Sequence, residues 1–132
     1  MYRILLIEDD PLVQRALRDV MRPEGFEVFL AGDAATGLSM AASDKPDLIV
    51  LDVNLPDRNG IEVCGELKSS PTTRHIPVVV MTGEAREVSM KVRGLEAGAE
   101  DYLLKPVSPA VLVSRIRALL KTATRPSRRQ GD

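Results

Sequence analysis

Short apolar runs alternate along this chain with longer segments whose apolar residues recur at helical spacing. The runs cover residues 2–7, 26–31, 47–51, 76–81 and 101–104. Three of the five are apolar almost throughout, which is typical of parallel strands that helices cover on both faces. The pattern therefore predicts five strands, most of them buried.

A segment with helical periodicity follows each run. The first helix is expected to begin at Asp10 and Pro11, because aspartate caps helices well and proline suits the first turn. Its core-facing stripe is expected to comprise Leu12, Ala16, Leu17 and Val20. The other helices are expected at residues 33–42, 60–68, 84–97 and from 108 onward.

Five strand–helix repeats predict a doubly wound α/β fold, in which right-handed crossovers place helices on both faces of one parallel sheet. Periodicity leaves the order of the strands open. Residues 123–132 have no apolar periodicity. We therefore expect a domain of residues 1–122, followed by a flexible tail or the start of a linker at residues 123–132.

Composition narrows the class of protein further. Apolar residues make up 44% of the 132 and aromatic residues only 3%, so the core must be aliphatic. A net charge of −1 gives no sign of nucleic-acid or membrane binding, and no apolar run reaches the roughly 20 residues that span a bilayer. The single cysteine, Cys64, excludes an internal disulfide. We expect a cytoplasmic protein.

Chemically active side chains follow four of the five predicted strands. Glu8 and Asp9 follow the first, Asp52 ends the third, Thr82 follows the fourth and Lys105 follows the fifth. Ligand sites of open α/β sheets form outside the carboxyl ends of the strands. We therefore expect these five side chains to meet at one edge of the sheet.

This set of groups favours phosphoryl transfer. Neighbouring carboxylates repel one another, and a divalent cation relieves that repulsion. Oxygen ligands without a nearby histidine or cysteine point to Mg²⁺ rather than Zn²⁺. Lys105 provides a point charge for a phosphate oxygen, and Thr82 provides a hydrogen-bond donor. Asp52 would then be the nucleophile that forms an aspartyl phosphate.

Simpler interpretations exist for single residues but not for the whole set. Asp52 alone could be a turn residue, and Lys105 alone a solvated loop lysine. One residue is enough to cap the first helix, and Asp10 is expected to do so because Pro11 follows it, which leaves Glu8 and Asp9 without a structural explanation. His75 precedes a strand, away from the active edge, and is not expected to take part in catalysis or metal binding.

Four segments together resemble the response-regulator receiver domain of two-component signalling: residues 4–13, 47–63, 76–84 and 98–112. The resemblance covers roughly residues 2–122. It implies a flavodoxin-like sheet with strand order 2-1-3-4-5. It also implies a phosphohistidine donor on a histidine kinase or histidine phosphotransfer protein, and a domain that catalyses only its own phosphorylation and dephosphorylation.

The same resemblance assigns the phosphoryl chemistry to residues of this chain. Asp52 would be the phospho-acceptor, and Lys105 would contact the phosphoryl group. Mg²⁺, or Mn²⁺, would be held by Glu8, Asp9, Asp52 and the backbone carbonyl of Asn54, with Asp9 as a direct ligand.

It further implies a switch. Thr82 would offer its hydroxyl to the phosphoryl group, Tyr102 would then turn inward, and Asn54 and Glu84 would tune the rate of self-hydrolysis. The output surface would combine the helix at 84–97, the strand at 101–104 and the last helix. The resemblance also implies a phosphorylation-favoured homodimer, because similar charge pairs build a dimer in DNA-binding members of the family. The charged residues on that surface are Lys91, Arg93, Glu100, Asp101, Arg115 and Arg117.

Two other classes of protein fit less well. A phosphohydrolase with an aspartate nucleophile usually has a second aspartate two residues later as acid and base, and here that residue is Asn54. A phosphorylation-independent protein-binding module is a further alternative. A flavin-binding module would need aromatic stacking and a phosphate loop. This chain has two Tyr, two Phe and no Trp.

Overall fold

The computed structural model describes residues 1–83 and 97–131, with side chains up to residue 122. Five parallel strands form one sheet with the order β2-β1-β3-β4-β5. The strands are β1 (Arg3–Ile7), β2 (Glu27–Ala31), β3 (Leu48–Asp52), β4 (Val78–Thr82) and β5 (Asp101–Leu104). The predicted doubly wound fold and the flavodoxin-like order are therefore confirmed.

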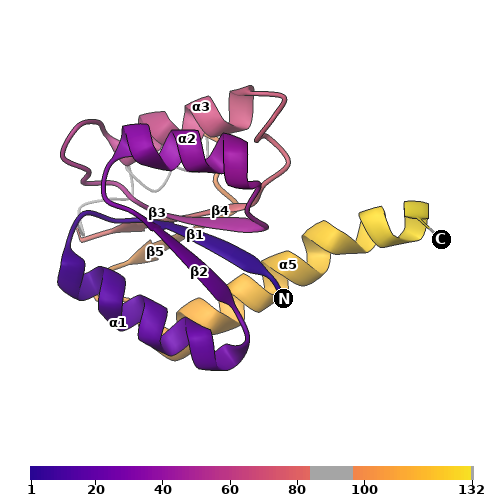
Figure 1. Cartoon of the computed structure of the whole chain (residues 1–132), viewed down its shortest axis with the longest axis horizontal. Helices are drawn as coiled ribbons and strands as arrows, with labels where there is room; N and C mark the ends of the chain where they lie inside the picture. Colours follow the sequence, from indigo (N-terminus) through magenta and orange to yellow (C-terminus); the bar gives the residue numbers. More distant parts are fainter. Residues whose placement is uncertain (84–96, 132) are drawn as a thin grey trace.

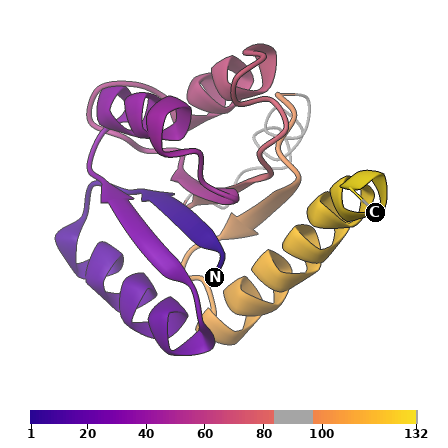
Figure 2. The same ribbon diagram turned by 45° about the vertical axis from the view of Figure 1, so that its right-hand side comes forward.

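Helices cover both faces of this sheet (Figure 1). One face carries α2 (Ala34–Asp44) and α3 (Gly60–Ser69), and the other carries α1 (Pro11–Met21) and α5 (Pro109–Gly131), as Figure 2 also shows. A short 3₁₀ helix, η1 (Arg22–Glu24), follows α1. The predicted helix at 84–97, with Glu84, Lys91 and Arg93, lies outside the described residues.

Side-chain caps fix the start of three helices. Asp10 accepts a hydrogen bond from the Leu12 N–H, which confirms the expected cap of α1. Asp33 accepts one from the Thr36 N–H at the start of α2. Asn59 caps α3 by accepting one from Ile61. Each cap satisfies a backbone donor that the helix itself cannot pair.

The core has two halves, one on each face of the sheet. Every residue of β3 and β4 is buried, and most of these side chains are β-branched or leucine. On the α2 and α3 side the core includes Leu5, Ile49 and Leu51. On the α1 and α5 side it includes Ile4, Leu6, Val50, Leu112 and Ile116. An aliphatic core was expected from the composition.

One prediction about α1 is wrong. Leu12 is 71% exposed and Ala16 is also exposed, whereas Leu17 and Met21 are the buried residues of the helix. The first turn of α1 lies beside the loop after β5 rather than over the sheet, and Leu12 there helps to line an apolar groove with Val107. The spacing of apolar residues indicates which side of a helix faces the sheet. It does not indicate whether the sheet extends as far as the first turn of that helix.

The last helix is longer than predicted. The backbone of α5 stays helical to Gly131, through the segment expected to be a flexible tail, and its last turns extend past the sheet (Figure 1). The absence of an apolar stripe in residues 123–131 predicts that this segment does not pack on the core. It does not exclude a helix, because the segment contains good helix formers such as Arg, Gln and Ala. The division of the chain near residue 122 stays a prediction.

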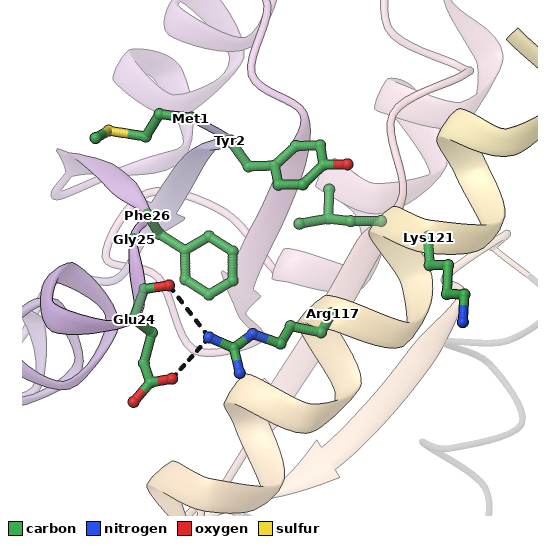
Figure 3. Close-up of a pocket in the computed structure, with 8 residues that line it drawn as sticks. Met1, Tyr2, Glu24, Gly25, Phe26, Arg117 and Lys121 are labelled. Carbon is green, nitrogen blue, oxygen red and sulfur yellow. Dashed lines mark hydrogen bonds and ion pairs between the residues drawn. The ribbon is translucent and has the colours of Figure 1, made fainter. Parts of the chain in front are cut away.

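Figure 3 shows how α5 is held at the amino ends of the strands. The Arg117 guanidinium lies 5.8 Å from the centre of the Phe26 ring, and it donates to the Glu24 carbonyl at 3.1 Å and to Glu24 Oε1 at 2.7 Å. Tyr2 and Lys121 line the adjoining cavity of about 410 Å³. This cavity lies at the edge of the sheet opposite Asp52.

Candidate functional site

Strand register brings the predicted site residues together at the carboxyl edge of the sheet. Asp52 ends β3 opposite Met81 of β4, and Thr82 ends β4 opposite Leu104 of β5. The Lys105 N–H then donates to the Thr82 carbonyl at 2.7 Å. The parallel arrangement therefore delivers side chains from distant parts of the sequence to one place.

Glu8 is buried at the centre of this edge, with only 1% of its surface exposed. Its Oε1 accepts a hydrogen bond from Lys105 Nζ at 2.8 Å, and its Oε2 accepts one from the Asp10 N–H at 3.0 Å. Burial raises the pKa of Glu8 above its ordinary value, although the bonds from Lys105 and Asp10 oppose this and the charge of Asp52 adds to it. A cation at this edge would favour the ionised carboxylate.

Asp52 is equally enclosed, with 2% of its surface exposed. Lys105 Nζ lies 3.1 Å from its Oδ2, and the Asn54 N–H donates to its Oδ1 at 3.3 Å. One ammonium therefore bridges two buried carboxylates. Burial by itself would lower the pKa of Lys105, but the hydrogen bond to Glu8 and the charge of Asp52 outweigh it and raise that pKa.

Three carboxylates at this edge could hold a metal ion together. One oxygen each of Glu8, Asp9 and Asp52 lies within 4.8 Å of the others, and Asp9 is the exposed member. The donors are all oxygen, and an exposed side leaves room for water ligands. This chemistry fits Mg²⁺, which takes one or two protein carboxylates and keeps several waters. The residues present therefore fit the expected ion.

Gly60 has a structural part in this site that the sequence did not reveal. A Cβ atom at Gly60 would lie 2.2 Å from the Asp52 carbonyl oxygen and 2.7 Å from Val53 Cα. The Gly60 N–H also donates to the Val53 carbonyl at 2.7 Å. The first residue of α3 thus packs directly on the backbone that carries Asp52, which only a residue without a side chain allows.

Asp57 is a second residue that the sequence did not single out. Its carboxylate accepts hydrogen bonds from the N–H groups of Ala34 at 2.8 Å and Ala35 at 3.0 Å, the first two residues of α2. These bonds hold the pKa of Asp57 below its ordinary value, with the bond from Ala34 the largest cause. No local sequence signal links residues 23 positions apart.

The two expected switch residues are both buried. Thr82 has no exposed surface, and Tyr102 is 7% exposed. The Tyr102 ring belongs to the core on the α2 and α3 side. The expected turn of Tyr102 on phosphorylation stays a prediction. The Lys105–Pro106 peptide bond beside the site is cis, a point the sequence left open.

Charged residues of the expected dimer surface pair within the chain. Arg115 lies 3.0 Å from Asp101, Lys68 lies 2.8 Å from Glu100, and Arg117 binds Glu24. Arg115 and Arg117 are about half exposed, so these two pairs can exchange partners at little energetic cost.

An apolar groove of about 490 Å³ lies next to the site. It runs between α1 and the loop after β5. Its lining includes the Lys105 and Pro106 segment. No helix among the residues with described structure is both long and apolar enough to cross a membrane.

Comparison with known proteins gives consistent matches. The family model of the response regulator receiver domain matches residues 4–117. Response regulator MprA of Mycolicibacterium vanbaalenii is 46% identical over 123 residues, which cover 92% of this chain and 52% of that protein. Response regulator PleD of Caulobacter vibrioides is 44% identical over 120 residues, which cover 90% of this chain and 26% of PleD. The chain thus spans about half of MprA and about a quarter of PleD.

Solved structures agree with the sequence matches. A response regulator from Chloroflexus aurantiacus superposes with a TM-score of 0.86 at 34% identity, covering 91% of this chain and 98% of that one. A CheY-like receiver domain from Methanospirillum hungatei superposes with a TM-score of 0.89 at 28% identity, covering 96% of this chain and 98% of that one.

Proposed function

Because the chain belongs to the response regulator receiver domain family of two-component systems, we propose that it accepts a phosphoryl group on Asp52. The donor would be a phosphohistidine on a histidine kinase or histidine phosphotransfer protein. One observation carries this proposal: Lys105 Nζ bridges Glu8 and Asp52 at 2.8 and 3.1 Å in a site of three clustered carboxylates. A purely structural role would not need this many buried charges.

The site residues would divide the reaction as follows. An oxygen of Asp52 forms a bond to phosphorus while the bond from phosphorus to the histidine nitrogen breaks. Lys105 then moves its hydrogen bonds from the carboxylates to a phosphoryl oxygen. Glu8, Asp9, Asp52 and the Asn54 carbonyl would hold Mg²⁺, which would supply positive charge for the transferred group.

The reverse step, loss of the phosphoryl group to water, would limit the lifetime of the signal. Asn54 is exposed in the loop next to Asp52, so its amide can orient an attacking water. Glu84 would act with it, as the resemblance implies. We therefore propose a domain that catalyses its own phosphorylation and dephosphorylation and acts on no other substrate.

The groove between α1 and the loop after β5 supports docking of the donor protein. A phosphohistidine must approach Asp52 from the open edge of the sheet, and this groove borders that edge through Lys105. Leu12, 71% exposed, gives the partner an apolar contact there. A contiguous apolar groove beside a site is typical of an interaction surface.

The signal would leave through a shift in packing. Phosphorylation adds about 1.5 to 2 negative charges at Asp52, and Thr82 would turn to bind the new oxygens. Tyr102 would then turn inward, with the region of 84–97, β5 and α5 as the output surface. A homodimer across this surface would require Arg115 and Arg117 to exchange their partners within the chain. Ultracentrifugation with and without beryllofluoride measures that dimer.

A small-molecule phosphohydrolase is the alternative enzyme class. It would need an acid or base two residues after the nucleophile, and Asn54 offers no such proton. Hydrolysis of generic phosphoesters by the purified chain would support that class instead. We also propose a cytoplasmic location, since the phosphohistidine donors of two-component systems act there.

The central test compares the wild-type chain with Asp52→Asn. Each is incubated with acetyl phosphate and Mg²⁺, and its intact mass is measured. We expect the wild-type chain to gain one phosphoryl group and the variant to gain none. A wild-type chain that stays unmodified under these conditions would refute the proposed function.

A further inference from the structure

The loop between β3 and α3 is attached to a second element at its tip. Asp57 lies in this loop, five residues after Asp52, and its two carboxylate oxygens accept the N–H groups of Ala34 and Ala35. A carboxylate at a helix N-terminus is also favoured by the helix dipole. The tip of the loop is therefore bound to the first turn of α2.

Capping of α2 does not account for this attachment. Asp33 already caps α2 from its own chain segment by accepting the Thr36 N–H at 2.7 Å. Asp57 comes from a different element and binds the two preceding amides. Its bonds thus join α2 to the loop after β3. A second contact at the tip, the Arg58–Glu66 pair at 2.8 Å, has side chains that are 35% and 53% exposed and contributes little.

The base of the same loop is closed on itself. The Gly60 N–H donates to the Val53 carbonyl, and Asn54 and Asn59 form an antiparallel bridge. Asn54 also donates its N–H to Asp52 Oδ1. These contacts connect the base of the loop to Asn54, so a shift of the loop at its tip can reach the backbone groups of Asn54.

We propose that Asp57 is a positioning residue for magnesium binding: by binding the amides of Ala34 and Ala35, it holds the loop so that the Asn54 carbonyl faces the acidic cluster. The inference rests on the proposed function, which assigns that carbonyl to the metal. It adds α2 to the elements that determine metal affinity. By thermodynamic reciprocity, a bound metal ion strengthens the contact between Asp57 and α2.

The test measures Mg²⁺ binding to the unphosphorylated chain by calorimetry. Loss of a group that orients a metal ligand commonly weakens metal affinity about 10-fold or more, and we expect about 10-fold for Asp57→Ala. Asp57→Asn keeps one acceptor oxygen, so its Mg²⁺ affinity should lie between those of the wild type and Asp57→Ala. Asp33→Ala and Asp33→Asn are the matched controls, because they remove an acid from the same helix terminus without touching the loop. We expect both to bind Mg²⁺ as the wild type does.

Two further measurements distinguish a positioning role of Asp57 from a general loss of folded structure in the variant. In acetyl phosphate reactions, Asp57→Ala should need about 10-fold more Mg²⁺ for half-maximal rate while reaching the wild-type rate at saturation. In the wild-type chain, added Mg²⁺ should slow hydrogen exchange at the amides of Ala34 and Ala35. This exchange measurement needs no variant, so it tests the inference even if Asp57→Ala folds poorly.

The inference is wrong if Asp57→Ala binds Mg²⁺ as tightly as the wild type, if the Asp33 controls weaken binding equally, or if Mg²⁺ leaves the two amides unchanged. Failure of the proposed function would look different. In that case the wild-type chain would not be modified at Asp52, whatever the Mg²⁺ affinities of the Asp57 variants.

Discussion

Lys105 Nζ lies 2.8 Å from Oε1 of Glu8, a residue 97 positions earlier in the chain, and both side chains meet at the carboxyl edge of the sheet. The same ammonium lies 3.1 Å from Asp52. Because Glu8 and Asp52 are almost fully buried, the lysine is the cation that compensates both charges among the residues with described contacts. Removing it would leave two carboxylates close together without that compensation.

Lys105→Met should therefore destabilise the chain in the absence of metal, by about 1 to 3 kcal/mol, since a buried charge loses its partner. Added Mg²⁺ should restore more stability in this variant than in the wild type, because the cation replaces the missing charge. Thermal unfolding with EDTA and with Mg²⁺ measures both effects. If Mg²⁺ stabilised the wild type and Lys105→Met equally, the role of Lys105 as the cation that bridges Glu8 and Asp52 would be contradicted.

Gly60→Ala tests the packing of α3 on the backbone of Asp52. The new Cβ would meet the Asp52 carbonyl oxygen at 2.2 Å, so the end of β3 must shift, at a cost of about 1 to 3 kcal/mol. Gly65→Ala is the control on the same helix, because its Cβ would lie 4.0 Å from Ala97. We expect Gly65→Ala to raise stability by about 0.5 to 1 kcal/mol.

Denaturant unfolding distinguishes these two glycine variants directly. Gly60→Ala should also slow modification of Asp52 by acetyl phosphate, while Gly65→Ala should not. Equal behaviour of the two would show that contact at Gly60 does not constrain the strand end.

Leu12→Ala should separate partner docking from phosphoryl chemistry. Leu12 is 71% exposed, so the free energy of unfolding should change by no more than about 0.5 kcal/mol. Modification by acetyl phosphate should stay at the wild-type rate, whereas transfer from a phosphorylated partner should slow. Val111→Ala is the control, because Val111 is 44% exposed and does not line the groove. Normal phosphotransfer to Leu12→Ala would exclude this groove as the docking surface.

The burial of Cys64 in the core predicts that the stability of the chain depends on pH in the alkaline range. Burial raises the pKa of its thiol to about 11 from 9.0. The unfolded chain therefore loses this proton at lower pH than the folded chain. The resulting contribution to stability is complete below pH 9 and is lost as pH rises toward about 11. Wild type should lose stability relative to Cys64→Ala over this interval, as measured by urea unfolding at each pH.

Alkylation of Cys64 provides an independent check at neutral pH. The buried thiol should react with iodoacetamide far more slowly in the native chain than in urea, because little thiolate forms and access is blocked. Similar rates in both conditions would show that α3 opens readily around Cys64.

The fold was predictable because buried parallel strands leave continuous apolar runs. The position of the site was predictable as well, because Asp52, Thr82 and Lys105 follow those runs. Other features depend on contacts between distant elements. The bond from Asp57 to α2 and the exposure of Leu12 follow from how loops and helices meet in space. The extended α5 was missed because its last turns form without an apolar stripe.

The strand order has a mechanical consequence for the proposed signal. β3 is the central strand, paired with β1 on one side and β4 on the other, and all five of its residues are buried. We therefore expect the backbone at Asp52 to move little and to serve as a fixed reference point. Displacement on phosphorylation must then occur in the parts that surround this point, and the amplitude of motion should increase from β3 toward the loops and the β5 edge.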